Sequence, residues 1–168
     1  MTVTIVPIEL RHVESLNDCV AEVARERRFL SIVEGFTLDQ SAAWVAADRV
    51  RDNPFLVALD EDRVVGWCEV RRDILPGRAH TGLLGMGLLA PYRGRGLGRQ
   101  LLDQALQQAR DRSFERVELM VRSPNSRAIR LYAQVGFREE GRKRDAVRLD
   151  NGSEDEVLMA LHLRENFR

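Results

Sequence analysis

Arginine and glycine alternate in one short segment of this chain, Arg93-Gly94-Arg95-Gly96-Leu97-Gly98. The segment follows an apolar run that ends at Leu89, and it precedes the apolar periodicity of an amphipathic helix from Leu97 to Ala109. A glycine-rich turn between a strand and a helix gathers backbone N–H groups at the positive end of the helix dipole. Such a turn binds phosphate, and arginine side chains add charge-assisted contacts. The segment therefore predicts a site for a phosphate-bearing ligand.

A second patterned segment lies further along the chain. It reads Asn125-Ser126-Arg127-Ala128-Ile129-Arg130-Leu131-Tyr132-Ala133-Gln134-Val135-Gly136-Phe137. The order Arg-x-x-Gly-x-Gly in the first segment and Asn-x-x-Ala-x-x-Leu-Tyr-x-x-x-Gly-Phe in the second resemble the GNAT superfamily of N-acetyltransferases. The resemblance covers nearly the whole chain and is strongest to the bacterial branch that acts on small molecules and amino acids. It implies an enzyme that transfers an acetyl group from acetyl-CoA to a primary amine.

Composition narrows the class of protein. The chain has 168 residues, of which 44% are hydrophobic and 31% charged, which is typical of one globular domain over residues 1–168. Lys plus Arg equals Asp plus Glu at 26 each, so no net field favours nucleic acid or an anionic membrane. The first residues do not resemble a signal peptide, and no apolar run reaches membrane-spanning length. We expect a cytoplasmic protein without a nucleic-acid or membrane partner, and without a metal because Cys19 and Cys68 lack metal-site spacing.

Periodicity and turn signals predict a chain of the α/β class. Strands are expected at Val3–Leu10, Phe55–Leu59, Arg63–Arg71, His80–Leu89, Arg116–Val121, Phe137–Leu149 and Glu154–Leu163. Helices are expected at His12–Arg28, Leu38–Arg51, Gly96–Arg112 and Asn125–Val135. Hairpin turns are expected at Asp60-Glu61-Asp62 and Asp150-Asn151-Gly152. This order, which the resemblance also implies, gives the GNAT fold: a mixed, mostly antiparallel sheet of about seven strands with helices on both faces.

The resemblance assigns the cofactor site to the glycine turn and the strand before it. The turn would hold the pyrophosphate of coenzyme A. The strand is expected to carry a bulge and to splay from its neighbour, so that backbone groups of Met86 and Leu88 pair with pantetheine and the Leu88 N–H bonds the thioester oxygen. Asn125 is expected to cap its helix and to touch the cofactor. The residues expected to contact coenzyme A are Met86, Leu88, Leu89, Arg93, Gly94, Arg95, Gly96, Leu97, Gly98 and Asn125.

Acetyl transfer also needs an acid for the departing thiolate and a base for the amine. The resemblance places Tyr132 at the position of the acid. The base stays open, because the strand before the glycine turn has no carboxylate between Thr81 and Leu89, where the family often has one. His80 and Glu69 are the two main candidates, each acting directly or through water. A surface ion pair with a neighbouring arginine is an equally good interpretation of Glu69.

The acceptor site is expected in the loop between the first two helices, which covers that site in the relatives. Phe29, Leu30 and Phe36 would form apolar walls, and Glu34 would hold a cationic amine. An amino-acid-like small molecule is the leading substrate, followed by a polyamine and by a protein N-terminus or lysine. Transfer is expected to be direct, because no cysteine stands where an acyl-enzyme would need one. The alternatives are a non-catalytic acyl-CoA-binding sensor and transfer of a longer acyl group such as succinyl. The resemblance also makes a homodimer through the last strands an expectation.

Overall fold

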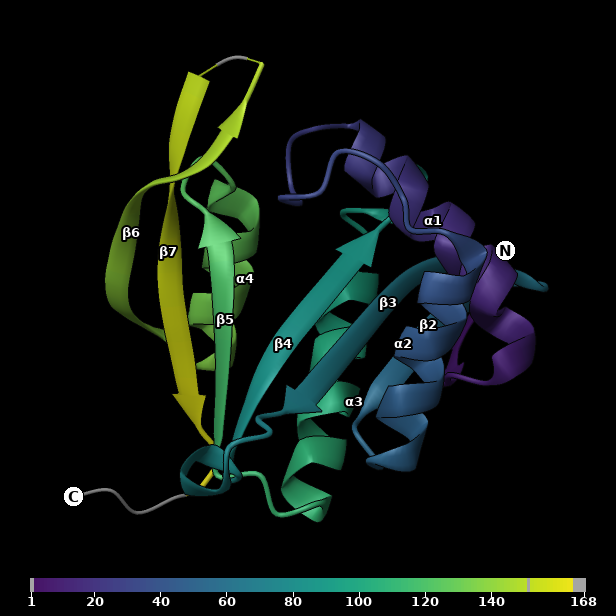
Figure 1. The fold of residues 1–168 in the computed structure, drawn as a ribbon, viewed down its shortest axis with the longest axis horizontal. Helices are drawn as coiled ribbons and strands as arrows, with labels where there is room; N and C mark the ends of the chain where they lie inside the picture. Colours follow the sequence, from purple (N-terminus) through teal and green to yellow (C-terminus); the bar gives the residue numbers. More distant parts are fainter. Residues whose placement is uncertain (1, 151, 165–168) are drawn as a thin grey trace.

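The computed structural model describes residues 2–150 and 152–164 and has a mixed α/β fold (Figure 1). The helices are α1 (Val13–Arg25), α2 (Leu38–Val50), α3 (Leu97–Asp111) and α4 (Ser126–Val135). The strands are β1 (Val3–Pro7), β2 (Phe55–Asp60), β3 (Arg63–Arg72), β4 (Thr81–Leu88), β5 (Arg116–Arg122), β6 (Arg138–Leu149) and β7 (Gly152–His162). They form one sheet in the order β1-β2-β3-β4-β5-β7-β6, in which only β4 and β5 run parallel. The predicted mixed, mostly antiparallel sheet is confirmed.

The largest differences from the predicted elements lie near the N-terminus. The first strand ends at Pro7, because Glu9 and His12 form reciprocal side-chain to backbone hydrogen bonds that start a short 3-10 turn. Helix α1 ends at Arg25 rather than Arg28, and Arg27 has a left-handed φ of 55°. The hairpin between β2 and β3 is confirmed. In the second hairpin Leu149 pairs with Gly152, while Asn151 lies outside the described residues.

Strand β4 has two neighbours for only part of its length. It pairs with β3 from Gly82 to Leu88 without a shift in register, so the bulge expected there is absent from these residues. Its parallel pairing with β5 covers only Thr81, Gly82 and Leu83. Beyond Leu83 the two strands diverge, as Figure 1 shows. The expected splay is present, and it leaves one edge of β4 without a partner strand.

The sheet separates two helical layers. Helices α1 and α3 both pack against β3, with α1 beside α2 in front of the sheet in Figure 1 and α3 behind it. Glu69 of β3 bonds to Trp44 of α2, whereas Met86 and Leu88 of β4 lie beside Gly98 of α3. Side chains alternate along a strand, so one face of β3 and β4 meets α2 and the other meets α3. No helix of the described segments is long and apolar enough to cross a membrane.

Close packing at the start of β4 gives a test of this arrangement. A Cβ at Gly82 would lie 2.5 Å from Val70 Cγ1 and 2.7 Å from Phe114 Cε1, so a methyl group has no room. We expect Gly82→Ala to lower the free energy of unfolding by about 1–3 kcal/mol, measured by denaturant titration. At Gly77 a Cβ meets no atom within 4 Å, so Gly77→Ala is the matched control and should leave stability unchanged. Equal stability of both variants would contradict the packing described.

Candidate active site

The glycine turn has the backbone geometry of an anion site. Gly94 and Gly96 have φ values of +79° and +80°, which side chains other than glycine rarely adopt. The first helical hydrogen bond of α3 runs from Gln100 N–H to Gly96 C=O, so the N–H groups of the three preceding residues have no intrahelical acceptor. A Cβ at Gly96 would meet no atom within 4 Å, so this turn faces open space. These features fit a pyrophosphate group.

The side chain of Arg93 has partners within the protein, and its contact with the cofactor stays a prediction. Its Nε donates to the Leu88 carbonyl at 2.8 Å, and its two terminal nitrogens donate to the Glu26 carboxylate at 2.8 and 2.5 Å. The guanidinium also stacks on Phe29, 4.5 Å from the ring centre. Arg93 therefore ties the turn to the end of α1. Phe29 packs under this arginine, and its expected role as a wall of the acceptor pocket stays a prediction.

Two other arginines stand beside the turn without a carboxylate partner among the described residues. Arg95 lies within the turn and is exposed. Arg127, at the start of α4, has a terminal nitrogen 2.7 Å from the position that a Cβ on Gly94 would take. Arg127 was not predicted from the sequence, although its place two residues after Asn125 in the second motif was a usable signal. Both cations are available to an anionic ligand of the turn.

The unpaired edge of β4 presents backbone groups beside the turn. The backbone N–H of Leu89 donates to the Val65 carbonyl of β3 at 2.9 Å, so it points away from β5. The Leu89 side chain is buried. Backbone groups alternate along an antiparallel ladder, so those of Met86 and Leu88 face the diverging β5. Arg93 occupies the Leu88 carbonyl. The edge can thus offer both backbone groups of Met86 and the N–H of Leu88, whereas Leu89 has no free amide to offer.

Tyr132 lies on the α3 side of the sheet. Its ring is buried, 5.7 Å from the ring of Phe137, and its helix is capped by the Asn125 side chain, which accepts from Ala128 N–H at 3.2 Å. The predicted cap is confirmed, while the contact of Asn125 with the cofactor stays a prediction. Burial, with a smaller effect from Cys68, raises the pKa of the Tyr132 phenol. The phenol therefore stays protonated at neutral pH, as an acid requires.

Glu69 lies on the opposite face, under α2. It is 4% exposed, and its Oε2 accepts a hydrogen bond from Trp44 Nε1 at 2.8 Å. Its Oε1 is 3.7 Å from Arg71 Nε and 3.2 Å from the position of a Cβ on Gly85, so glycine leaves room for it over β4. Burial first, and then the adjacent Asp48 carboxyl, raise the pKa of Glu69 well above its usual value. Trp44 and Asp48 were not selected from the sequence.

The structure does not place His80 beside Glu69 or the unpaired edge of β4. His80 precedes the first residue of β4, is exposed, and accepts the backbone N–H groups of Glu115 and Arg116 at its carbonyl. It stands at the end of β4 that pairs with β5, whereas Leu88 is at the other end of this 8-residue strand. At ~3.3 Å per residue the two ends are more than ~20 Å apart. His80 is therefore not beside the unpaired edge, which corrects its candidacy as the base.

The loop between α1 and α2 is held by Arg122, which sequence analysis missed. This arginine of β5 is 4% exposed, pairs with Glu154 of β7 at 2.6 Å, and donates to the carbonyls of Arg27 and Leu30 at 3.1 and 3.2 Å. Leu30 thus contributes a backbone anchor. Glu34 is exposed. Neither Leu30 nor Glu34, nor Phe29, lines the cavity described next.

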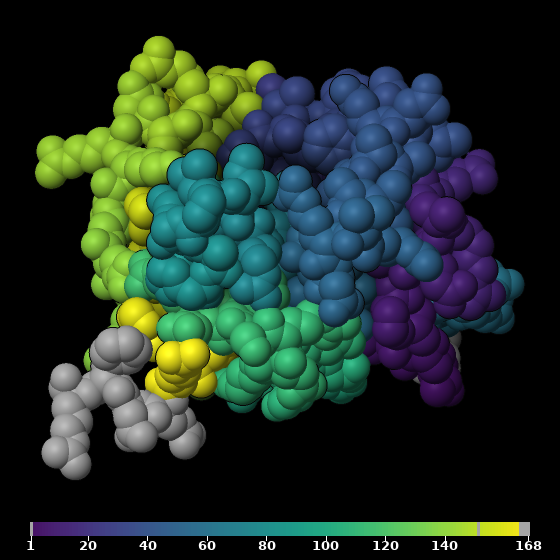
Figure 2. Space-filling view, turned by 60° about the horizontal axis from the view of Figure 1, so that its bottom comes forward, coloured from purple at the N-terminus to yellow at the C-terminus, as the bar shows by residue number. Residues whose placement is uncertain are grey.

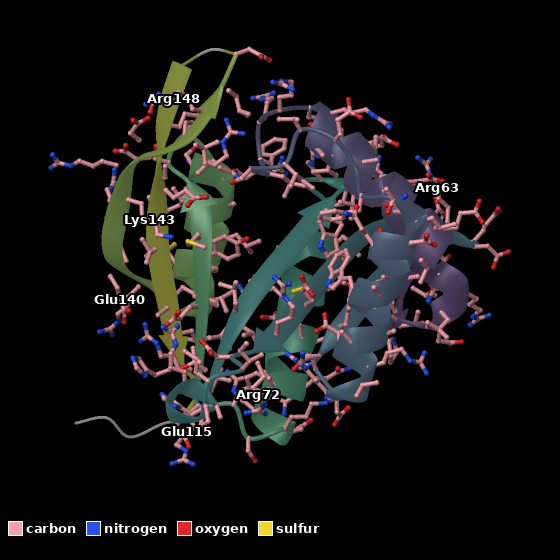
Figure 3. The ribbon with its side chains drawn as sticks, viewed as in Figure 1. Arg63, Arg72, Glu115, Glu140, Lys143 and Arg148 are labelled. Atoms are coloured by element: carbon pink, nitrogen blue, oxygen red, sulfur yellow. The ribbon has the colours of Figure 1, made fainter. Side chains whose placement is uncertain are left out.

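A cavity of about 670 Å³ lies on the α2 side of the sheet, where β4 and β5 still pair. The segment that follows β3, teal in Figure 2, lies between α2 and the β6–β7 hairpin. Six cationic and three acidic side chains line the cavity: Arg51, Arg71, Arg72, Arg78, Arg116 and Lys143, with Asp73, Glu118 and Glu140. In Figure 3 Glu140 and Lys143 lie on β6, apart from Arg72 near the end of β3.

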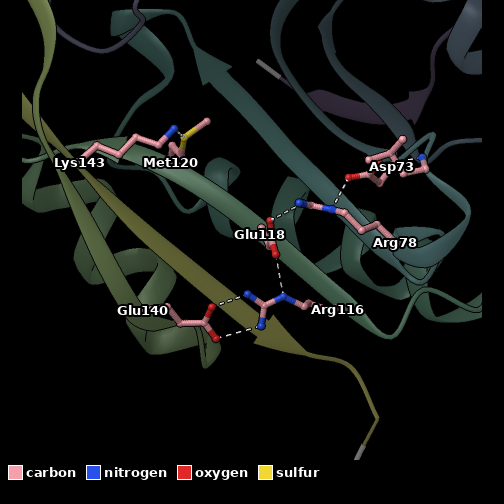
Figure 4. Close-up of polar contacts among 8 residues, drawn as sticks. Asp73, Arg78, Arg116, Glu118, Met120, Glu140 and Lys143 are labelled. Atoms are coloured by element: carbon pink, nitrogen blue, oxygen red, sulfur yellow. Dashed lines mark hydrogen bonds and ion pairs between the residues drawn. The ribbon is translucent and has the colours of Figure 1, made fainter.

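The ion pairs in this cavity leave part of its positive charge uncompensated (Figure 4). Arg78 bridges Asp73 at 2.7 Å and Glu118 at 3.5 Å, and Arg116 contacts Glu118 and Glu140. Lys143 instead lies with its Nζ 2.9 Å from Met120 Sδ. Neither Lys143 nor Arg51 has a carboxylate partner within residues 2–150 and 152–164. The cavity therefore suits a small ligand that carries an anionic group.

Neither cysteine has the chemistry of a nucleophile. Both are buried, and burial raises the pKa of the Cys19 thiol to about 12 and that of Cys68 further. The reactive thiolate is thus disfavoured at both positions. Across the described residues no group of three or more His, Cys, Asp or Glu side chains is placed to hold a metal ion.

The turn geometry predicts the effect of a single substitution. In Gly96→Val the backbone is strained at a φ of +80° and a branched side chain enters the open space of the turn. We expect acetyl-CoA affinity, measured by titration calorimetry, to fall more than about tenfold. Gly152→Val is the matched control, because Gly152 also has a positive φ and open surroundings but lies in the β6–β7 hairpin. Unchanged affinity in Gly96→Val would place the phosphate site elsewhere.

The sequence of this chain is similar to those of known N-acetyltransferases. YycN, an uncharacterized N-acetyltransferase of Bacillus subtilis (strain 168), is 33% identical over 81 residues, which is 48% of this chain and 52% of that protein. The ribosomal protein bS18-alanine N-acetyltransferase of Escherichia coli (strain K12) is 37% identical over 70 residues, 42% of this chain and 47% of that protein. The chain thus spans about half the length of these curated relatives.

Solved structures show the same fold over the whole chain. The acetyltransferase yncA from Salmonella typhimurium, determined with its cofactor acetyl-CoA, superposes with a TM-score of 0.91 at 20% identity, covering 100% of this chain and 98% of that one. Residues 19–137 match the Acetyltransferase (GNAT) family, a span that includes the glycine turn, the unpaired edge of β4 and both Glu69 and Tyr132. The chain belongs to the GNAT acetyltransferase family.

Proposed function

We propose that this chain is an N-acetyltransferase that passes the acetyl group of acetyl-CoA directly to the primary amine of a small molecule. The observation that carries the proposal is the unpaired edge of β4, with a buried carboxyl group on one face of the sheet and a buried phenol on the other. The phenol stays protonated at neutral pH, so it has a proton to give to the leaving thiolate. The carboxyl group, Glu69, is the better of the two base candidates, because His80 lies at the far end of β4.

The chain's own residues divide the binding of acetyl-CoA between them. The α3 N-terminus with Arg95 and Arg127 would hold the pyrophosphate, and the backbone edge at Met86 and Leu88 would hold the pantetheine amides. When bound, acetyl-CoA supplies an acetyl group activated as a thioester. A backbone N–H at this edge is also suited to bond the carbonyl oxygen as negative charge develops on it.

Two side chains would move protons during the transfer. Glu69 takes a proton from the ammonium form of the acceptor, which frees the nitrogen lone pair for attack. Tyr132 donates its hydroxyl proton to the departing sulfur, and its raised pKa keeps that proton in place until it is needed. The buried thiols of Cys19 and Cys68 support direct transfer without an acyl-cysteine.

The acceptor that the cavity suits best is amino-acid-like. The cavity adjoins Glu69 through Arg71, whose Nε is 3.7 Å from Glu69 Oε1. An amine at Glu69 could therefore place a carboxylate among the uncompensated cations, Lys143 and Arg51. A polyamine would meet repulsion there. A single domain over residues 1–168, a cytoplasmic location and a homodimer stay predictions.

A second candidate acceptor is a protein N-terminus, because one relative is a ribosomal protein alanine N-acetyltransferase. A peptide N-terminus shares the primary amine but lacks the adjacent carboxylate, so the two acceptors differ in the use they make of the cationic cavity. A sensor that binds acyl-CoA without catalysis is the remaining alternative, and the pairing of a buried acid with a buried base argues against it.

A thiol-release assay with acetyl-CoA separates these acceptors. We expect amines that carry a carboxylate to give a kcat/KM at least about tenfold above polyamines and short peptides, a difference of roughly 1.4 kcal/mol. Release only with peptides would favour the protein acceptor. Release with no amine, together with acetyl-CoA binding by calorimetry, would contradict the proposal and favour the sensor. The same panel with succinyl-CoA tests the longer acyl group.

Tyr132→Phe tests the acid. The substitution removes one hydroxyl from a buried ring and keeps the packing against Phe137. We expect kcat to fall roughly 10²-fold while acetyl-CoA affinity stays within about twofold of the wild type. Phe137→Leu, which alters the same cluster without touching the hydroxyl, controls for a packing effect. An unchanged kcat across the pH range would remove Tyr132 from this role.

A further inference from the structure

A second buried carboxyl group stands beside Glu69 and has no role in the reaction as described so far. Asp48 lies near the end of α2 and is 3% exposed. Its Oδ1 accepts a hydrogen bond from Asn53 Nδ2 at 2.7 Å. Its Oδ2 is buried and has no donor among the described residues. Trp44, which bonds Glu69, lies four residues before Asp48 and so on the same face of α2. The Asp48 carboxyl is close enough to Glu69 to raise its pKa.

The surrounding donors limit where a proton can sit on this pair. Asn53 Oδ1 accepts the Arg72 backbone N–H at 3.1 Å, which fixes the amide so that its NH₂ faces Asp48 Oδ1. Trp44 Nε1 can only donate, so Glu69 Oε2 is an acceptor there. Asp48 Oδ2 is the oxygen left without a donor. A proton shared between Asp48 and Glu69 satisfies it and avoids two adjacent buried negative charges.

We propose that Asp48 is a positioning residue for the base, forming with Glu69 a buried carboxyl pair that acts as one proton acceptor. The inference rests on the proposed function. In the fully ionised pair the acceptor ammonium loses its proton to Glu69: the N–H bond breaks, its electron pair stays on nitrogen, and an O–H bond forms. Asp48 then shares that proton. The resulting neutral amine attacks the thioester carbon, and the carbon–sulfur bond breaks as Tyr132 gives its proton to the sulfur. The nitrogen loses its second proton to solvent as the amide forms, and Tyr132 takes up one proton from solvent. The carboxyl pair returns its own proton to solvent after the products leave.

The charges around the pair favour this use. Arg71, half exposed on β3, is the one cation within 4 Å of Glu69 among the described residues, and at 3.7 Å it lowers the pKa only in part. Burial and the neighbouring Asp48 carboxyl both raise the pKa of Glu69. A base whose proton affinity approaches that of the amine accepts its proton more readily. Activity should therefore increase as pH rises through the pKa of Glu69.

Carboxyl ¹³C NMR of the full chain, labelled at Asp and Glu, tests the pair without relying on activity. In the wild type we expect Glu69, whose signal is assigned by its absence in Glu69→Gln, to titrate well above its usual range. In Asp48→Asn, which keeps the side-chain shape, the pKa of Glu69 should fall by at least about one unit. Asp39→Asn, an exposed change on the same helix, should leave it unmoved.

The pH profile of kcat/KM then tests the positioning role. In Asp48→Asn the acidic limb should move to lower pH by the same amount as the Glu69 titration, and Asp39→Asn should keep the wild-type limb. A Glu69 titration that Asp48→Asn does not change would overturn the inference, as would a shifted titration with an unshifted limb. If Asp48→Asn shifts the Glu69 titration but the protein acetylates no amine, the carboxyl pair is supported and the proposed function is overturned. The two failures are therefore distinguishable.

Discussion

β4 has a second strand beside it for only three residues, and most of the site depends on that limited pairing. The backbone groups of a strand inside a sheet form hydrogen bonds with both neighbouring strands. Beyond Leu83, those of β4 pair only with β3. The free edge leads directly into the glycine turn and the N-terminus of α3. Backbone donors of two kinds, from a strand edge and from a helix end, are therefore adjacent in space because they are adjacent in sequence.

Two arginines hold the structure around that divergence. Arg93 links the glycine turn to Glu26 at the end of α1, and Arg122 links β5 and Glu154 to the loop that follows α1. Both guanidinium groups make several hydrogen bonds within the protein, and the Arg122 side chain is buried. The loop after α1 is thus anchored to both diverging strands. This use explains why the Arg93 side chain, although part of the motif, commits three of its five N–H donors within the protein.

The fold was predictable because it rests on local signals that are strong here. The apolar spacing of α3 and the glycines of the turn identify a strand, a turn and a helix with little help from tertiary contacts. Side-chain partners were harder, because a sequence does not say which strand lies opposite another. His80 and Glu69 were equal candidates from sequence, and the register that sets Glu69 opposite Gly85 separates them. The proposed role of Asp48 could not be predicted from the sequence, because it depends on Glu69 lying beside Asp48 in the folded chain.

In the proposed enzyme the base, Glu69, and the acid, Tyr132, lie on opposite faces of the sheet, and this has a chemical consequence. A base needs an ionised form that accepts a proton, and an acid needs a neutral form that gives one, so a charge on one would disturb the other if they touched. Here β3 and β4 stand between Glu69 and Tyr132, and each acquires its raised pKa from its own buried surroundings. In the proposed enzyme, the amine and the thioester would meet where β4 diverges from β5. The sheet thus separates the two proton-transfer groups electrostatically while keeping both beside one reaction centre in the proposed enzyme.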